Sequence, residues 1–446
     1  MKKDYLTSIL LVVIVAGALG WYLTHRKSQD LIPPLRERQG PISTTSEWLN
    51  TKAAIQGLQS KLREKPNDLQ SKLLLALAYM QEARVTGEHP YYYPAALQLI
   101  NDILDQKPEN QSLLYEATVA KASIQLSLHQ FAEALQTAQA ALQYNNHSAS
   151  IYGVLTDANV ELGRYEEAIK MADQMVALRP DLKSYSRVSY LREIHGDMPG
   201  AIEAMKMAVS AGFPGLEQTV WTTVTLGNLY EKTGDLKNAA LAYEQALAQY
   251  PKYAFALAGL GRLAVKNKKE QEAIKLFTEA AAVLPEFSFQ EELVRLYQQK
   301  GEKKKANQMM QELLAGMEED QEAGHIVDLE LAAIHLELGH NPDGALAYAL
   351  KEFKRRPDNI DVCKTLAHIY YKKQDYTQAA AYLQKATRTN SQDATLLCLS
   401  GLVNYRLGKH IPGGNLIRKS LTIDPYQNTP LSREGKNLLH QSVSKL

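Results

Sequence analysis

Few residues of this chain are spaced as catalytic or metal-binding groups would be. His335, Glu337 and His340 lie together in HLELGH, but this spacing spreads them around a helix and its end, so we predict no metal site. Gly259 and Gly261 resemble part of a dinucleotide-binding fingerprint, yet they fall inside a predicted helix with no strand before it. The sequence contains no HExxH, GxxxxGK[ST] or GxSxG motif. We therefore predict no catalytic residues and no cofactor.

The cysteines and the charge balance exclude further classes of protein. Cys363 and Cys398 are the only two cysteines, they form no zinc-binding spacing, and we expect both to be buried thiols. Lys and Arg number 50 against 49 Asp and Glu, which argues against nucleic acid as the partner. The run Lys303–Lys305 follows Gly301 at a predicted helix start and is interpreted as a solvated face.

The N-terminus carries an apolar run that no charge interrupts. Residues 5–24, YLTSILLVVIVAGALGWYLT, have the length of a membrane-spanning helix, and we assign residues 1–24 to a signal anchor. Cleavage after Ala18-Leu19-Gly20 is the alternative interpretation. Lys2 and Lys3 favour an inside N-terminus and an extracytoplasmic chain, whereas basic residues after the run favour the opposite, cytoplasmic placement.

A segment rich in helix-breaking residues follows the apolar run. Residues 25–46 contain Pro33, Pro34, Gly40 and Pro41, which favour extended backbone. We predict a flexible linker that holds the folded part away from the membrane.

The remaining chain repeats with a period near 34 residues. Turn glycines recur at intervals of 33–38 residues or about twice that, and Lys268 and Gln374 occupy two slots where glycine is missing. Helix-ending prolines recur in the same phase. The turn glycines are Gly163, Gly196, Gly234, Gly301, Gly339 and Gly408, and the prolines are Pro66, Pro108, Pro180, Pro251, Pro285, Pro357 and Pro425. Apolar residues between these marks recur at helical spacing, so each period is a helical hairpin.

Residues 220–251 show the hairpin most clearly. Leu226, Gly227 and Tyr230 share one helical face, and Ala239, Tyr243 and Ala246 share another after the turn at Gly234. Small residues at Gly227 and Ala239 let the two helices cross closely. This pattern resembles the tetratricopeptide motif W-x2-L-G-x2-Y, A-x3-F, A, P, although other residues replace Trp in most units.

The resemblance implies an all-α, right-handed superhelical solenoid of about ten tetratricopeptide-like hairpins over residues 47–427, preceded by one transmembrane helix. A capping helix is expected over 428–446, with Ser432 as a possible N-cap. Inserts at 83–94, 212–219 and 315–324 interrupt the period and are expected to project from the surface. The hairpins are expected at 69–110, 115–148, 149–181, 182–216, 220–253, 254–286, 287–322, 325–359, 360–393 and 394–427.

In the resembled family, the first helix of each hairpin lines a concave groove that holds a peptide or partner protein. The family's contact positions correspond to Asp157, Glu161, Tyr190, Asn228, Glu231, Arg262, Lys266, Arg295, Lys364, His368 and Tyr371. These residues change from acidic to basic along the predicted groove. The clamp for chaperone tails is incomplete, because Val224 and His368 stand where that clamp has Lys and Asn.

Three functions fit the sequence to different degrees. The first is a membrane-tethered interaction scaffold without enzymatic activity, placed in the inner membrane of a bacterium because the sequence is similar to bacterial tetratricopeptide proteins. The second is an envelope-biogenesis assembly factor that recruits several partners, although the C-terminal cysteine module of comparable anchored proteins is missing. The third is the binding subunit of an enzyme complex, which is disfavoured because the repeats leave no room for a catalytic domain.

Overall fold

The computed structural model describes residues 32–38, 43 and 46–443. The chain divides into two compact units, Met1–Lys121 and Ala122–Leu446. All regular elements of the described residues are helices. None of these helices combines the length and apolar character that crossing a membrane requires. The predicted span 5–24 lies outside the described residues.

The first unit is a helical hairpin with a third helix against it. Helix α3 (Leu69–Thr86) pairs with α4 (His89–Asp105), and α2 (Ser46–Glu64) packs on α3. Asp68 caps α3 by accepting a hydrogen bond from the Ser71 amide, and left-handed Gly87 ends it. The expected insert at 83–94 is largely helical, because α4 begins only three residues after α3 ends.

The second unit repeats one hairpin. Within residues 122–443, eight consecutive helix pairs follow the hairpins expected from the sequence. Seven of them lie inside the expected ranges, and the exception is the pair expected at 220–253, which begins at Glu217. Helix α6 precedes the pairs and packs on α7, and α5 lies at the boundary between the two units. The helices are α5 (Gln111–Ser127), α6 (Phe131–Ala141), α7 (Ala149–Glu161), α8 (Tyr165–Leu178), α9 (Leu182–Ile194), α10 (Met198–Ser210), α11 (Glu217–Lys232), α12 (Leu236–Gln249), α13 (Ala254–Lys266), α14 (Glu270–Val283), α15 (Phe287–Gln299), α16 (Lys303–Glu322), α17 (Asp328–Glu337), α18 (Pro342–Arg355), α19 (Ile360–Lys372), α20 (Tyr376–Ala386), α21 (Ala394–Arg406) and α22 (His410–Ile423).

The hairpin turns use left-handed backbone, as the repeated glycines predict. Gly163 and Gly234 have φ of 74° and 75°, and the substitutes Lys268 and Gln374 adopt φ of 60° and 63°. One turn differs from the expectation. Gly339 is not left-handed; the next residue, His340, has φ of 48°, so the turn is shifted by one position.

Small residues let the paired helices approach closely. A Cβ atom on Gly227 would lie 2.5 Å from the Tyr243 ring, and one on Gly259 would lie 2.6 Å from the same ring. The ring therefore fills the space between α11, α12 and α13, and Tyr243 and Ala239 are fully buried. This packing confirms the close helix crossing predicted at Gly227.

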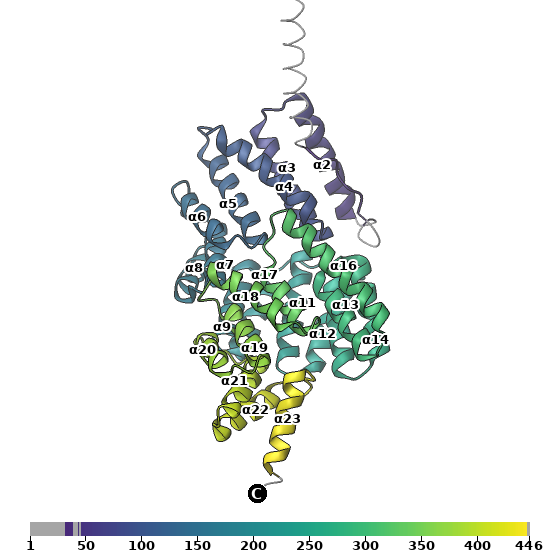
Figure 1. Ribbon diagram of the computed structural model, residues 1–446. Coiled ribbons are helices and arrows are strands. Elements are labelled where there is room, and N and C mark those ends of the chain that lie inside the picture. The colour runs from purple at the N-terminus through teal and green to yellow at the C-terminus, as the bar shows by residue number, and fades with distance from the viewer. Residues whose placement is uncertain (1–31, 39–42, 44–45, 444–446) are drawn as a thin grey trace, which may run out of the picture. The chain divides into compact units, whose positions relative to one another are not determined.

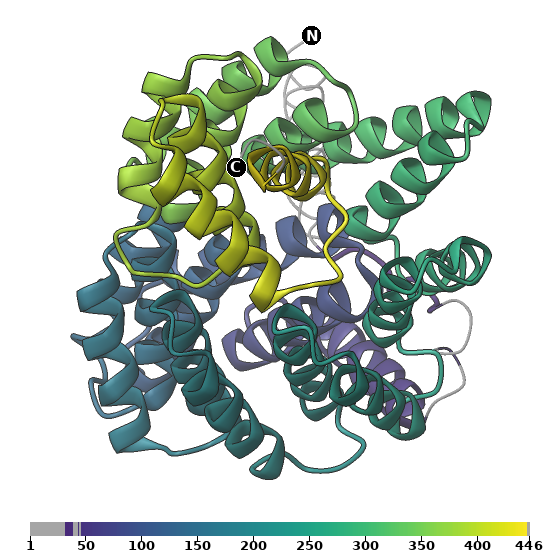
Figure 2. The same ribbon diagram turned by 90° about the horizontal axis from the view of Figure 1, so that it is seen from below.

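The array in the second unit turns back onto itself. The hairpin pairs follow one another around a ring in Figure 2, and α17–α19 lie beside α7–α9 in Figure 1. The Ile326 amide donates to the Leu128 carbonyl over 3.0 Å, and the Ile360 amide donates to the Tyr165 hydroxyl over 2.9 Å. These partners are about 195 residues apart in sequence. The segments at Ile326 and Ile360 therefore lie one superhelical turn after those at Leu128 and Tyr165 and contact them.

Four turn-to-turn contacts form a series. The hairpin turns at His129, Gly163, Gly196 and Gly234 meet the segments at residues 324–326, 358–359, 390–392 and 423–425. A Cβ atom added to Gly163 would lie 2.2 Å from the Asp358 carbonyl oxygen, and one on Gly196 would lie 2.5 Å from that of Asn390. Glycine is required at both positions because another backbone occupies the space of a side chain.

The array ends in helix α23 (Pro430–Val443), which packs on α21 and α22. The expected N-cap at Ser432 is displaced, because the helix begins at Pro430 and the Ser432 amide donates to the Thr429 hydroxyl over 3.1 Å. A Cβ atom on Gly435 would lie 2.8 Å from the Ile417 side chain. The glycine that weakens α23 in isolation thus permits its close packing on α22.

The other two expected inserts have different structures. Residues 315–324 mostly prolong α16, which reaches Glu322. Residues 211–216 form the connection between α10 and α11, and its Phe213 and Leu216 side chains are exposed. The insert expected at 212–219 therefore has apolar side chains at the surface, whereas the other two inserts are largely helical.

Candidate functional site

The candidate groove residues all come from the first helices of their hairpins. Helices α7, α9, α11, α13, α15 and α19 carry the eleven positions, because each hairpin repeats the same orientation. The structure divides the eleven residues into three groups. Some join neighbouring hairpins, some join one superhelical turn to the next, and some remain partly exposed.

The first group links α11 to α13 around the Tyr243 hydroxyl. This oxygen lies 2.8 Å from Asn228 Oδ1 and 2.9 Å from Glu231 Oε2. The Arg262 guanidinium donates to Glu231 over 2.9 Å and to Asn228 over 2.6 Å. Burial raises the pKa of Tyr243, so the phenol stays protonated as a hydrogen-bond donor. Asn228, Glu231 and Arg262 therefore form one satisfied network.

Lys266 connects this network to the C-terminal hairpins. Its ammonium group lies 2.7 Å from Asp424 and 3.8 Å from Glu231, and all three side chains are at least 85% buried. A cavity of about 120 Å³ adjoins this ion pair. The cavity is lined by Glu193, Met198, Glu231, Lys232, Lys266, Ser391, Gln392, Asp393, Ala394, Thr395 and Asp424. Residues of two successive superhelical turns thus share one polar cavity.

Glu161 on α7 serves the same purpose three hairpins earlier. Its carboxylate pairs with Arg356, whose guanidinium is 5% exposed and also binds Glu352. The Asn359 side chain donates to the Glu161 carbonyl over 2.9 Å. Burial raises the pKa of Glu161 to about 7, against the opposing attraction of Arg356. Glu161 is therefore committed to the contact between turns.

His368 and Tyr371 lie on α19 and also have internal partners. The His368 Nδ1 atom lies 3.1 Å from Glu337, while no hydrogen-bond partner is present at its buried Nε2. Burial lowers the pKa of His368 to about 4, so the ring is neutral near pH 7. The Tyr371 hydroxyl donates to Glu434 of α23 over 2.6 Å. Tyr371 therefore anchors the terminal helix.

Four candidates keep 35–38% of a side chain or residue accessible. Asp157 is 38% exposed beside Arg187, and Arg295 is 38% exposed beside Glu292. Lys364 is 35% exposed beside Asp361, and Tyr190 is 38% exposed. These residues come from four different first helices, so they present a phenol and both signs of charge to an approaching molecule.

Sequence reasoning missed the partners that occupy the other candidates. Arg356, Asp424 and Glu434 each bind a predicted groove residue, and each lies at or beyond a hairpin junction. Arg356 precedes Pro357, and Asp424 precedes Pro425, so a charged residue before the junction proline was an available signal. The signal could not be interpreted without knowing which hairpins one superhelical turn brings together.

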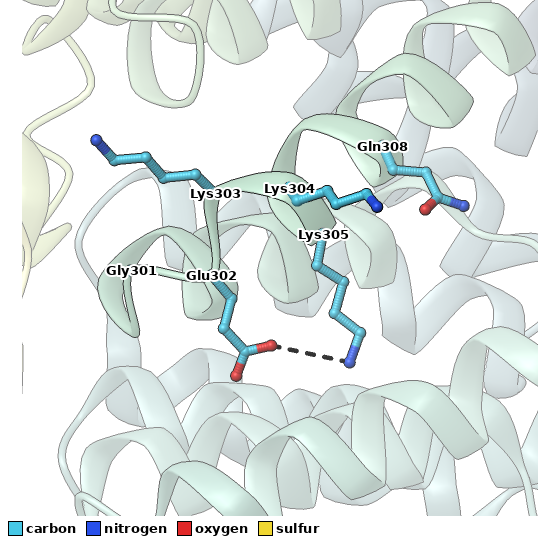
Figure 3. A pocket seen from close by; sticks show the side chains of 6 residues that line it. All are labelled: Gly301, Glu302, Lys303, Lys304, Lys305 and Gln308. Carbon is cyan, nitrogen blue, oxygen red and sulfur yellow. Dashed lines mark ion pairs between the residues drawn. The ribbon is translucent and has the colours of Figure 1, made fainter.

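The residues first considered for chemistry have structural partners. His335 stacks on Tyr348 with ring centroids 5.3 Å apart, and no three His, Cys, Asp or Glu of the described residues are arranged to hold a metal ion. Cys363 and Cys398 are buried, and burial raises the pKa of each thiol to about 11. Figure 3 shows Lys303, Lys304 and Lys305 at the start of α16, where their ammonium groups point in different directions.

Stacked helix pairs with a repeated turn define an all-helical repeat protein. The sequence profile of the tetratricopeptide repeat family matches residues 125–194, 224–287 and 364–410. The chain is a tetratricopeptide repeat protein, and repeats of this family indicate a protein–protein interaction scaffold.

Solved structures show similar helical arrays. The human IFIT1 dimer with PPP-AAAA is 15% identical, with 85% of this chain and 90% of that chain covered and a TM-score of 0.43. A tetratricopeptide repeat protein from Parabacteroides merdae is 20% identical, with 59% and 98% covered and a TM-score of 0.36. TTC0263 from Thermus thermophilus is 22% identical, with 46% and 98% covered and a TM-score of 0.36. No curated protein matches the chain significantly.

Proposed function

We propose that the chain is a membrane-tethered scaffold that binds a protein partner along the inner wall of its array and has no catalytic activity of its own. The observation that carries this proposal is the group of four partly exposed side chains, Asp157, Tyr190, Arg295 and Lys364, on four different first helices. The remaining candidates have internal partners that join neighbouring hairpins, successive superhelical turns or the terminal helix. The shape is thus fixed internally, while the four accessible residues remain available to a partner.

The tether belongs to the same proposal. Residues 5–24 would cross the inner membrane of a bacterium as one helix, with the array on the extracytoplasmic side. Eight Cα–Cα steps separate Thr24, at the end of this run, from Ile32, where the described chain begins. A chain of that length spans at most about 29 Å. The first unit would therefore lie close to the membrane, and not at the end of a 22-residue linker.

Fractionation and reporter fusions test the tether. The full chain should remain in the membrane pellet after carbonate extraction, and a variant lacking residues 1–24 should be released into the supernatant. A C-terminal alkaline phosphatase fusion should be active and a C-terminal green fluorescent protein fusion dark. Release of the full chain by carbonate would overturn the tether, and the opposite reporter result would place the array in the cytoplasm.

Site-specific photocrosslinking tests the binding surface. A photoreactive phenylalanine analogue at Tyr190 should give a discrete crosslinked protein in cells, because this residue is 38% exposed on the first helix α9. The same analogue at Lys275, which is 76% exposed on the second helix α14, serves as the control. Equal crosslinking at both positions, or none at Tyr190, would contradict the proposal. A crosslink to nucleic acid alone would show that the wall binds a different class of partner.

The number of captured proteins separates the scaffold from an assembly factor. One protein captured from Tyr190, Arg295 and Lys364 alike would support a single partner that follows the wall. Different proteins captured from these positions would support the recruitment of several partners.

A further inference from the structure

An extended segment at the start of the first unit is bound like a peptide ligand. The Pro33 carbonyl oxygen accepts hydrogen bonds from the Tyr79 hydroxyl over 2.8 Å and from the Gln59 side chain over 3.0 Å. The Pro34 carbonyl oxygen accepts one from the Tyr91 hydroxyl over 2.7 Å. The donors come from α2, α3 and α4, so the folded unit supplies every donor that these two carbonyls use.

Arg36 continues the same contact along α4. Its backbone amide donates to the Tyr92 hydroxyl over 3.1 Å, and its guanidinium lies 2.9 Å from the Glu88 carboxylate. The guanidinium carbon also lies 3.7 Å from the centre of the Tyr91 ring. An ion pair and a cation–π contact therefore recognise one side chain, and both favour arginine.

Arg38 anchors the end of the segment. Its fully buried side chain donates to both oxygens of Glu82, over 2.6 and 3.0 Å, and to Glu47 over 2.9 and 3.1 Å. The guanidinium carbon lies 4.7 Å from the Trp48 ring. Glu82 is itself fully buried, so an occupant must supply a positive charge at this point.

These contacts match the chemistry by which proteins recognise proline-rich peptides. Consecutive prolines preorganise an extended backbone whose carbonyls face outward, and aromatic side chains with hydroxyl groups form the complementary wall. Tyr79, Tyr91 and Tyr92 form such a wall here. Three glutamates bind the two arginines: Glu88 binds Arg36, and Glu47 and Glu82 bind Arg38. An empty wall would leave the buried Tyr79 hydroxyl and Glu82 carboxylate without these partners.

We propose that α2, α3 and α4 form a receptor for an extended Pro-Pro-x-Arg-x-Arg peptide, and that residues 33–38 of the same chain are its built-in ligand. The receptor is distinct from the inner wall of the second unit. It binds the segment through carbonyl groups and two arginines, so a free peptide with the same pattern competes for it. This interaction does not depend on membrane tethering or on the partner of the inner wall.

Cutting the chain between ligand and receptor tests the proposal. Residues 39–42, which lie outside the described residues, are replaced by a site for a specific protease, and the full chain is purified in detergent micelles and cut. The fragment that ends at Arg38 should remain associated with the large fragment in size-exclusion chromatography. A synthetic peptide of residues 31–38 in excess should displace it, while the large fragment keeps its circular dichroism spectrum and melting temperature.

Two variants make the test specific. Arg36→Ala removes the ion pair and the cation–π contact, and it should weaken the association of the fragments about tenfold. Arg63→Ala removes a cation on α2 that binds only Ser60 in the structure's described contacts, and it should leave the association unchanged. Dissociation of the fragments on cutting would overturn the proposal. Equal weakening by both variants would do so too, as would unfolding of the large fragment on displacement, because the segment would then be part of the fold.

Discussion

Adding a single methyl group at Gly163 tests the contact between successive superhelical turns. The residue sits at the turn between α7 and α8 with φ of 74°, and the Asp358 backbone lies against it. A Cβ atom there would be 2.2 Å from the Asp358 oxygen, whereas Gly408, with φ of 79°, has no atom within 4 Å of its Cβ position. Gly163→Ala and Gly408→Ala therefore share the backbone strain but differ in the clash.

The expected magnitudes follow from the local contacts. Placing alanine in left-handed backbone costs about 1–2 kcal/mol in either variant. The clash at Gly163 must also push the hairpin turn away from the Asp358 backbone, because neither backbone segment can move independently of its own hairpin. Separation breaks the hydrogen bonds of Arg388 to the Gly163 carbonyl, Asn359 to the Glu161 carbonyl and Ile360 to the Tyr165 hydroxyl. At about 0.5–1.5 kcal/mol each, these bonds raise the total to roughly 3–6 kcal/mol.

Hydrogen–deuterium exchange with mass spectrometry separates the two contributions. Gly163→Ala should accelerate exchange at residues 159–166 and also at residues 356–362, which are distant in sequence, because exchange follows local opening. Gly408→Ala should affect only its own hairpin. Gly196→Ala, with a distance of 2.5 Å to the Asn390 oxygen, should resemble Gly163→Ala at its own contact. Equal effects of Gly163→Ala and Gly408→Ala, confined to each local turn, would refute the contact between superhelical turns.

Three further predictions concern buried charges. Burial and the neighbouring His325 lower the pKa of His129 to about 4, while Arg356, Asp320 and Glu330 also lie near this ring. The unfolded chain binds the proton first, so stability falls by about 2 kcal/mol between pH 7 and 5, and His129→Gln should remove that loss in thermal unfolding. Lys266→Met leaves Asp424 buried without its ammonium partner and should cost about 3 kcal/mol; unchanged hydrogen exchange at residues 423–427 would contradict this. Arg38→Ala should destabilise the first unit by about 3–5 kcal/mol in thermal unfolding, whereas Lys52→Ala, in an exposed ion pair with Glu37, should cost under about 1 kcal/mol.

The hairpins were predictable because their causes are local. The turn glycines and junction prolines mark each boundary, and the apolar period assigns each helix its buried face. Even the glycine substitutes Lys268 and Gln374 were found from phase alone, and both have left-handed backbone. The shift of the left-handed position from Gly339 to His340 was not predictable, because the repeat phase locates a turn only to within about one residue.

The internal occupation of the groove depends on a sum over many hairpins. Glu161 meets Arg356 only because the small rotations of about six successive hairpins add up to one superhelical turn. A slightly wider superhelical turn would have left Glu161 and Lys266 facing solvent, as is expected of groove residues. For the same reason Pro33 and Pro34 predicted a flexible linker, since nothing in their own segment reveals the tyrosines more than 40 residues away that bind it.

The sequence distance across the turn contacts has a consequence during synthesis. A ribosome adds about 5–20 residues per second, so the partners of Tyr165 and Glu161 emerge roughly 10–40 s after these residues themselves. Single hairpins form within microseconds to milliseconds, long before that delay ends. The nascent array therefore passes through an open coil in which Glu161 has no partner, and its closing is the last event of folding.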